Sequence, residues 1–225
     1  MIGERPETVA TPHWTEDLES GRECFRRAGV HVDEALARGD IPVLAAADCS
    51  LCMATLPAAR ARRHDARILW LDAHGDFNTP DTTPSGFLGG MCLAGACGAW
   101  DPGVAEAVPA EAVVLAGVRD LDVGERTNLE ATGATVLPPG ETLAAEVEDA
   151  LGDAPVYVHL DVDVLAGEFA PAAYPAPGGL TPDELERVLV AVAERGEVAG
   201  LEVTAFHTGD PRIAAKAVRA LLPGS

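Results

Sequence analysis

Short, continuous apolar runs alternate along the chain with longer amphipathic runs, and this alternation constrains the fold more than any other feature. The short runs are typical of strands covered on both faces, and the longer runs are typical of helices. The expected strands are Ile41–Ala46, Ile68–Asp72, Ala112–Ala116, Val156–Asp161 and Val198–Val203. The expected helices are Leu51–Arg63, Leu88–Trp100, Thr142–Leu151, Thr181–Arg195 and Pro211–Leu222. This βα succession predicts a three-layer α/β fold, a mostly parallel sheet with helices on both faces.

One expected helix carries a clear start signal. Thr181 suits the capping position, Pro182 the first helical position and Glu184 the third, so that Thr181 and Glu184 form a capping box. We therefore expect this helix to begin at Pro182.

Length and charge limit the function classes. The 225 residues can bury one substantial core, and Pro and Gly are not gathered in a linker, so one domain over residues 1–225 is expected. The formal net charge of −20 argues against nucleic acid and anionic membranes as partners. No basic segment precedes an apolar run at the start of the sequence, and no stretch approaches the roughly 20 apolar residues of a spanning helix. A cytoplasmic protein whose five cysteines are reduced is expected.

Polar residues follow three expected strands directly, at Asp48-Cys49, at Asp72 to Asp76 and at Asp161 to Asp163. In parallel sheets ligands gather beyond the carboxyl ends of strands. In extended backbone, alternate side chains share a face, which brings together Asp72, His74 and Asp76, and likewise His159, Asp161 and Asp163. Carboxylates buried in this way need a cation. Imidazole with several carboxylates suits manganese, zinc or iron, and carboxylates that can bridge favour two ions, which together activate water.

These motifs resemble the ureohydrolase family of arginases and agmatinases, over about residues 43–206. The resemblance rests on Asp72-Ala-His74-Gly-Asp76 with the loop that follows it, on Asp161-Val-Asp163, and on Gly200-Leu-Glu202-Val. It implies an arginase-like fold and two divalent metal ions, with manganese favoured. The implied metal ligands are the residue at position 49, Asp72 and Asp161 as bridges, Asp76 at one ion, and His74 with Asp163 at the other.

The resemblance also implies roles in catalysis and substrate binding. Asp76 orients the attacking hydroxide and takes its proton, and Glu202 faces the substrate's guanidinium group, although an alignment without a gap puts Ala205 there instead. Further residues match positions that bind an amino-acid substrate, with neutral donors for the carboxylate and acids for the amine. They are Asn78, Thr83, Ser85, Asp122 and Glu125. Agmatine, which lacks a carboxylate, would leave the neutral donors unused.

Three departures from the family pattern matter. Cys49 stands where the family has a metal-binding His. Cys49 is either a softer ligand that favours zinc or iron, or a ligand that weakens one site until only a single metal ion is retained, or a buried thiol that binds no metal. Gly89 stands where arginases carry a proton-shuttling His, and His207 is the expected replacement. His159 stands where a small polar residue is usual, and it either orients a ligand or shuttles protons. A redox role for Cys49 and Cys52 as a CxxC pair would leave the acidic clusters unexplained.

The N-terminal part, residues 1–40, is shortened relative to the family and lacks its first strand. An open sheet edge would then need a cover, from a second subunit or from the N-terminal segment. Because the family forms trimers or hexamers, a homo-oligomer is expected.

Together these features predict a metal-dependent hydrolase that cleaves a guanidino C–N bond of an arginine-like amino acid. N-Hydroxy-L-arginine, cleaved to hydroxyurea and ornithine, is the favoured substrate, and L-arginine, cleaved to urea and ornithine, is the second. The alternatives are a non-catalytic amino-acid-binding or metal-sensing protein, another amidine hydrolase, and a mononuclear zinc deacetylase of related fold.

Overall fold

A parallel sheet of six strands runs through the middle of the molecule in the computed structural model, which describes residues 14–205, 212, 215, 216 and 218–222. The strands lie in the order β1-β6-β5-β2-β3-β4, and every neighbouring pair is parallel. Their bounds are β1 Val43–Ala45, β2 Arg67–Leu71, β3 Val113–Ala116, β4 Thr135–Leu137, β5 Val156–Asp161 and β6 Val198–Thr204. The expected α/β architecture is confirmed.

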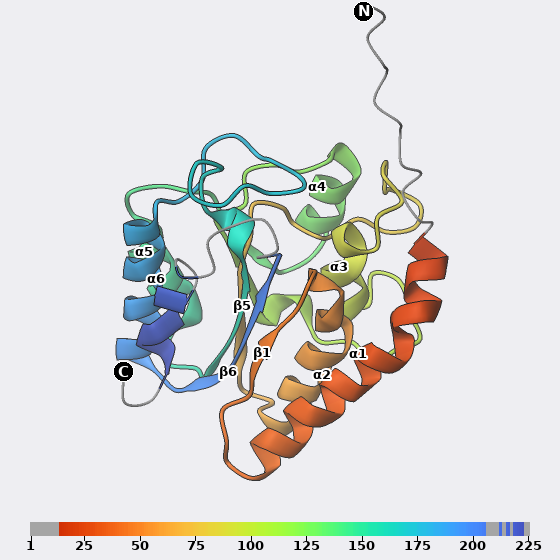
Figure 1. Cartoon of the computed structure of the whole chain (residues 1–225), viewed down its shortest axis with the longest axis horizontal. Coiled ribbons are helices and arrows are strands. Elements are labelled where there is room, and N and C mark those ends of the chain that lie inside the picture. Colours follow the sequence, from red (N-terminus) through yellow and green to blue (C-terminus); the bar gives the residue numbers. More distant parts are fainter. Residues whose placement is uncertain (1–13, 206–211, 213–214, 217, 223–225) are drawn as a thin grey trace, which may run out of the picture.

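Helices cover both faces of the sheet (Figure 1). On one face lie α1 (Trp14–Ala37), α2 (Cys52–Arg62), α3 (Cys92–Ala96) and α4 (Val123–Glu130). On the other lie α5 (Leu143–Leu151) and α6 (Pro182–Arg195). Short 3-10 turns follow several strands or precede helices: η1 Cys49–Leu51, η2 Gly89–Met91, η3 Ala110–Ala112, η4 Val162–Val164 and η5 Val218–Leu221.

The alternation of side chains along each strand divides the core into two layers. Leu69 and Leu71 of β2 pack on the side of α5 and α6, whereas Ile68 and Trp70 pack on the side of α1 and α2. All six residues of β5 are buried, as expected for a central strand covered on both faces. The site residues that follow β2 and β5 therefore extend from the buried centre of the sheet.

Some elements differ from the sequence-based expectation. Helices α1 and α4 and strand β4 were not expected, and the helix expected at Leu88–Trp100 is the turn η2 followed by the short α3. The helix expected at Pro211–Leu222 lies partly outside the described residues, which include the turn η5. In α1, Leu18, Phe25 and Val32 recur every seven residues, a stripe too narrow to stand out in the sequence, and this helix packs along α2.

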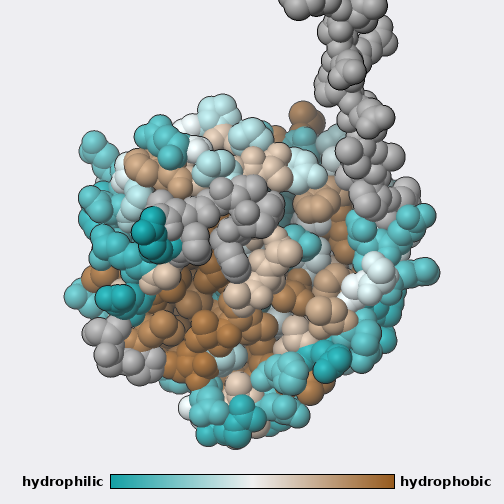
Figure 2. Space-filling view, in the orientation of Figure 1, coloured by the Kyte–Doolittle hydropathy of each residue, from teal (hydrophilic) through white to brown (hydrophobic). Residues whose placement is uncertain are grey.

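The strand β1 lies at one edge of the sheet, where Val43 and Ala45 are exposed. Figure 2 shows apolar side chains gathered on the face of the molecule where β1 and β6 lie. Among the residues that the structure describes, β1 therefore presents an exposed strand edge. Within the described residues, no helix combines the length and the apolar character needed to cross a membrane.

Candidate active site

A pocket of about 460 Å³ opens at the carboxyl ends of the strands. The lining residues come from the loops and turns after β1, β2, β3, β5 and β6: Ala47, Asp48, Cys49, Asp72, His74, Asp76, Asn78, Pro84, Ser85, Phe87, Gly89, Gly90, Asp120, Asp122, Glu125, Asp161, Asp163, Ala172, Ala173, Tyr174, Pro175 and Ala205. The acidic members are Asp48, Asp72, Asp76, Asp120, Asp122, Glu125, Asp161 and Asp163. A pocket with this many carboxylates favours cations, either metal ions or a cationic substrate.

The segment Asp72 to Asp76 is a turn, not the extended backbone that the alternation argument assumed. β2 ends at Leu71, the backbone N–H of His74 donates to Asp72 Oδ1 over 2.7 Å, and Asp76 has a φ of 49°. A Cβ at Gly75 would meet Leu121 Cδ2 at 2.7 Å and Glu125 Oε1 at 2.9 Å, so a larger residue there would displace these side chains. The turn still directs Asp72, His74 and Asp76 into the pocket. A positive φ at Asp76 is the kind of backbone strain that gathers at functional sites.

The segment Asp161 to Asp163 is also held by hydrogen bonds from backbone N–H groups. The strand β5 ends at Asp161, and in η4 the N–H of Asp163 donates to Asp161 Oδ1 over 2.8 Å. Asp163 Oδ1 in turn accepts from the N–H of Ala73 over 3.1 Å. The two acidic motifs are therefore fixed to each other, as the shared edge of β2 and β5 requires.

Asp72, His74 and Asp163 form one group of donors that could hold a metal ion. His74 Nδ1 lies 3.4 Å from Asp72 Oδ1 and 3.2 Å from Asp163 Oδ2. Partial burial alone would lower the pKa of His74, but its contacts with Asp163 and Asp72 raise that pKa to about 11. The two carboxylates therefore stabilise the protonated form of His74. The carboxylate oxygens and the imidazole nitrogen are donors that fit manganese or a similar divalent ion.

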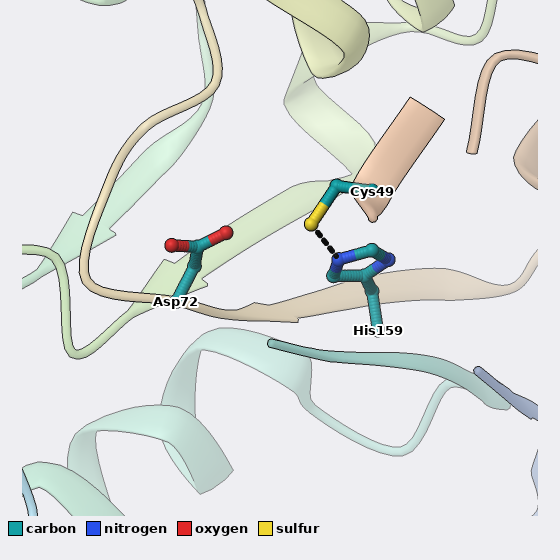
Figure 3. A group of neighbouring side chains, drawn as sticks. All are labelled: Cys49, Asp72 and His159. Carbon is teal, nitrogen blue, oxygen red and sulfur yellow. Dashed lines mark hydrogen bonds between the residues drawn. The ribbon is translucent and has the colours of Figure 1, made fainter. Parts of the chain in front are cut away.

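Cys49, Asp72 and His159 form a second group, in which the donor atoms lie within 4.8 Å of one another. Figure 3 shows the Cys49 sulfur directed at His159, with the Asp72 carboxylate nearby. The Sγ to Nε2 distance is 3.3 Å, and Cys49 also donates to Asp161 Oδ2 over 3.1 Å. Burial, followed by the charges of Asp161, Asp76 and Asp72, raises the pKa of the Cys49 thiol well above its usual value. A bound cation would relieve that cost, so this donor set also fits a divalent metal.

Asp76 and Asp161 line the pocket but lie outside both groups, as far as the described residues show. Asp76 is buried, and the thiol of Cys92 lies 3.5 Å from its Oδ2. Burial raises the pKa of Asp76 well above its usual value. Burial likewise raises the pKa of Asp161, to about 6. Both carboxylates can therefore exchange protons more readily near neutral pH than an exposed Asp.

Four of the five residues expected to bind substrate line the pocket, namely Asn78, Ser85, Asp122 and Glu125. Asn78 Nδ2 donates to Asp122 Oδ2 over 2.9 Å, and Ser85 also lines the pocket. Glu125 lines the pocket too, but it is buried, and its oxygens accept the N–H groups of Phe77 and Asp122. Its visible role is to join the loop after Asp76 to the start of α4.

Thr83 is not among the lining residues, because its Oγ1 accepts the N–H of Gly86 over 3.0 Å within its own turn. The sequence-based expectation had placed it in the pocket beside Ser85.

The structure does not bring Glu202 into the pocket, contrary to the expectation that it faces the substrate. This residue is 1% exposed, and its carboxylate accepts from Thr55 Oγ1 over 2.6 Å and from Tyr157 OH over 3.1 Å. Ala205, the position given by the alignment without a gap, lines the pocket instead. His207, the expected proton shuttle, lies outside the described residues.

A family model described as the arginase family matches residues 9–217 of the chain. The chain belongs to the arginase family. It is accordingly a ureohydrolase, a hydrolase of guanidino groups. The enzymes of this family bind a dinuclear metal site, and the two donor groups that share Asp72 are compatible with one.

Similar proteins include curated relatives and solved structures. The chain is 40% identical to N(omega)-hydroxy-L-arginine amidinohydrolase from Streptomyces lavendulae, over 98% of this chain and 81% of the relative. It is 31% identical to the arginase of Bacillus caldovelox, over 83% of this chain and 68% of the relative. The crystal structure of the arginase from Bacillus cereus superposes with a TM-score of 0.83 at 27% identity, covering 93% of this chain and 80% of that one.

In this arginase-family enzyme the mouth of the pocket also contains residues that the sequence analysis missed. Tyr174 and Phe87 both line it, with ring centroids 5.1 Å apart. Tyr174 lies in the loop between η4 and α6, and Arg119 holds this loop by donating to the carbonyl oxygens of Asp163 and Pro177. A long loop directly after a metal motif was the available signal, because such loops close over the ends of parallel strands.

Proposed function

We propose that this arginase-family enzyme hydrolyses N-hydroxy-L-arginine to hydroxyurea and ornithine, with L-arginine, which gives urea and ornithine, as the second candidate substrate. The observation that carries the proposal is the pocket itself, in which two metal-donor groups share Asp72 beneath a rim of amino-acid-binding character. The relative from Streptomyces lavendulae, named for its action on hydroxyarginine, supports the choice of substrate.

Cys49, Asp72, His74, Asp76, Asp161 and Asp163 are the proposed ligands of two divalent ions, with manganese expected in at least one position. When bound, the ions would lower the pKa of water so that a nucleophile exists at neutral pH. Asp76 is placed to take the water proton, because burial raises the pKa of its carboxyl. The proton then has to reach the leaving δ-nitrogen of ornithine, and Asp76 or His207 would deliver it.

The rim would select an amino acid. The α-carboxylate would accept hydrogen bonds from Asn78 and Ser85, and the α-ammonium group would pair with the exposed carboxylate of Asp122. Glu125 would support Asp122 by fixing the start of α4. The acidic pocket would hold the cationic guanidino group against the metal donors.

Gly89, which lines the pocket where the resemblance places a proton-shuttling His, favours N-hydroxyarginine over arginine. Without that His, the protein gives less assistance to protonation of the leaving amine. The hydroxyguanidine group has altered electronics, so its hydrolysis depends less on this assistance.

Metal-loaded protein should be incubated with N-hydroxyarginine, arginine, agmatine and guanidinobutyrate, and urea, hydroxyurea and ornithine should be measured. We expect N-hydroxyarginine to have the largest kcat/KM, and agmatine to be the poorer substrate because it lacks a carboxylate. No turnover of any of the four compounds would overturn the proposal.

For the whole protein we further propose one domain in the cytoplasm and assembly as a homo-oligomer, a trimer or hexamer, for which the apolar β1 edge offers a contact surface.

A further inference from the structure

His159 lies under the pocket floor with one ring nitrogen directed at the thiol of Cys49 (Figure 3). We propose that His159 is itself a metal ligand, which together with Cys49 and Asp72 forms a sulfur, nitrogen and oxygen site that takes zinc in preference to manganese. The inference rests on the proposed function in one respect, since this site would hold one of the two ions of the enzyme. The resulting centre is mixed, with a zinc-type position beside the oxygen-rich position of His74 and Asp163.

The distances suit a single small ion. A tetrahedral zinc ion with bonds of about 2.3 Å to sulfur and 2.0–2.1 Å to nitrogen would hold those two atoms about 3.5 Å apart. The Sγ of Cys49 and the Nε2 of His159 are 3.3 Å apart, so the ion would need shifts of only a few tenths of an ångström. A carboxylate oxygen of Asp72 lies within 4.8 Å of both. Asp161 Oδ2, 3.1 Å from the same sulfur, is the nearest further oxygen.

The ring of His159 is held in the orientation that a metal ligand needs. Its Nδ1 lies 2.6 Å from Glu202 Oε1, and a proton shared there leaves Nε2 with a free lone pair. Histidine ligands of metals commonly have such a carboxylate on the other ring nitrogen. The ring also stacks on Trp70, with centroids 3.5 Å apart and planes 4° apart. Trp70 Nε1 in turn donates to Asp72 Oδ2 over 3.2 Å, which fixes a second ligand.

This arrangement also gives Glu202 a role. Its carboxylate is held by Thr55 and Tyr157 as well as by His159, all of them buried. Glu202 is therefore a positioning residue that fixes the imidazole, and it does not need to reach the substrate. In a site without a cation, the charge of Asp72 would lie buried beside the carboxylates of Asp163, Asp76 and Asp161, which is unfavourable.

The donor types decide the metal. Thiolate and imidazole ligands favour zinc over manganese, whereas carboxylates with one imidazole suit manganese. Cys49 supplies the thiolate and His159 the imidazole in the first group, and Asp72, His74 and Asp163 make up the second. An ordinary pair of manganese sites would make no use of His159 Nε2, although this nitrogen is directed at the Cys49 sulfur.

The test is made on the full-length protein without substrate. Metal-free protein is incubated with zinc and manganese together, freed of excess ions, and examined by elemental analysis and by zinc K-edge X-ray absorption. We expect about one zinc per chain, with one sulfur neighbour at about 2.3 Å and nitrogen or oxygen neighbours at about 2.0–2.2 Å. In His159→Gln, whose amide can still bond Glu202 and accept from Cys49, zinc affinity should fall 10-fold or more while manganese is retained. The exposed His64→Gln is the matched control and should behave as wild type.

Zinc without a sulfur neighbour, or an unchanged zinc affinity in His159→Gln, would overturn the proposal. If His159→Gln does not fold, as judged by circular dichroism, Cys49→Ser takes its place, and in it the sulfur signal and tight zinc binding should both disappear. Because these measurements need no substrate, the zinc site can be confirmed even if no guanidino compound is turned over. Conversely, an active enzyme that takes up only manganese from the mixture of zinc and manganese would refute the zinc site and leave the proposed function standing.

Discussion

Asp72 has several structural roles in the pocket. It belongs to both donor groups, accepts the N–H of His74 over 2.7 Å and accepts from Trp70 Nε1 over 3.2 Å. It is 1% exposed, and burial together with the charges of Asp163, Asp76 and Asp161 raises its pKa well above the usual value. A buried carboxylate in such a position is stable as an anion only beside a cation, so its charge should matter more than its shape.

Asp72→Asn tests this point, because the amide retains an acceptor oxygen and the size of the side chain but loses the charge. We expect metal content to fall from about two ions to fewer than one per chain, and kcat/KM to fall by about three orders of magnitude, since both donor groups lose a ligand. Elemental analysis and steady-state kinetics measure these losses. Asp120→Asn is the matched control: Asp120 is exposed, lines the pocket and belongs to neither group, so its metal content should not change.

At the scale of single elements, the start of α6 is the best-defined local feature. Glu184 N–H donates to Thr181 Oγ1 over 3.2 Å, and Thr181 N–H donates to Glu184 Oε2 over 2.8 Å, which completes the capping box. α6 then buries Leu185 and Val188 against the sheet. A loose first turn would therefore weaken the packing of the whole helix.

Thr181→Ala should lower the free energy of unfolding by about 1 kcal/mol, the usual cost of losing a capping hydroxyl. Urea unfolding of the metal-loaded protein followed by circular dichroism measures this change. Thr142→Ala is the matched control, because Thr142 precedes α5 in the same way but makes no capping hydrogen bond. An equal loss in both variants would show that the capping box does not stabilise α6.

The capping box was predictable from the sequence because its signal is local. The same holds for most strands, whose buried apolar runs stand out, and for the acidic motifs at their ends. Helix α1 was not predictable in this way: its contact with α2 depends on Gly29, where a Cβ would meet the carbonyl oxygen of Ala54 at 2.9 Å. Close approach of two helices is a tertiary property that no pattern within one helix reveals.

Strand register explains why the site was predicted only in part. Glu202 of β6 pairs directly with His159 of β5, so both side chains lie on the same face and meet beneath the pocket. A sequence pattern places Glu202 near the end of a strand but does not fix which residue of β5 lies beside it, and one residue of shift would reverse its face. The turn at Asp76 was missed as well, because the residue types alone do not reveal its positive φ.

At the scale of the whole molecule, the two edges of the sheet differ. β1 exposes Val43 at 55%, on the face where apolar side chains gather, and β4 exposes Val136 at 38% at the opposite edge. An exposed apolar strand edge presents unpaired backbone groups that can pair with another chain. If the β1 edge is the contact surface, light scattering of wild type should give a multiple of the chain mass, and Val43→Glu should shift it toward the monomer. Val136→Glu should leave the assembly unchanged, and the same mass for all three proteins would contradict this assignment.

The metal-free protein should lose stability as pH rises, because its acidic pocket holds protons that the unfolded chain gives up. Burial, followed by the charge of Asp163, raises the pKa of Asp161 from 3.8 to about 6, and contacts with Asp163 and Asp72 raise the pKa of His74 from 6.5 to about 11. The stability linked to a raised folded-state pKa is present below the unfolded value and is lost as pH rises through the folded value. For Asp161 the loss falls between about pH 4 and 6, and for His74 it begins near pH 6.5. The pKa of Asp163, in contrast, is lowered from 3.8. The stability linked to that carboxyl is therefore lost when pH falls below this value, not when pH rises.

Metal ions displace those protons and should reverse the trend. We therefore expect the Tm of EDTA-treated protein to be several degrees lower at pH 8 than at pH 5.5, since each kcal/mol corresponds to roughly 2–4 °C in a domain of this size. Saturating metal should raise Tm more at pH 8 than at pH 5.5. Asp161→Asn, which cannot titrate, should show a smaller fall in Tm than wild type between pH 4 and pH 6, the range in which Asp161 titrates. A metal-free Tm that rises with pH would mean that the pocket carboxylates are compensated within the protein and do not depend on a cation.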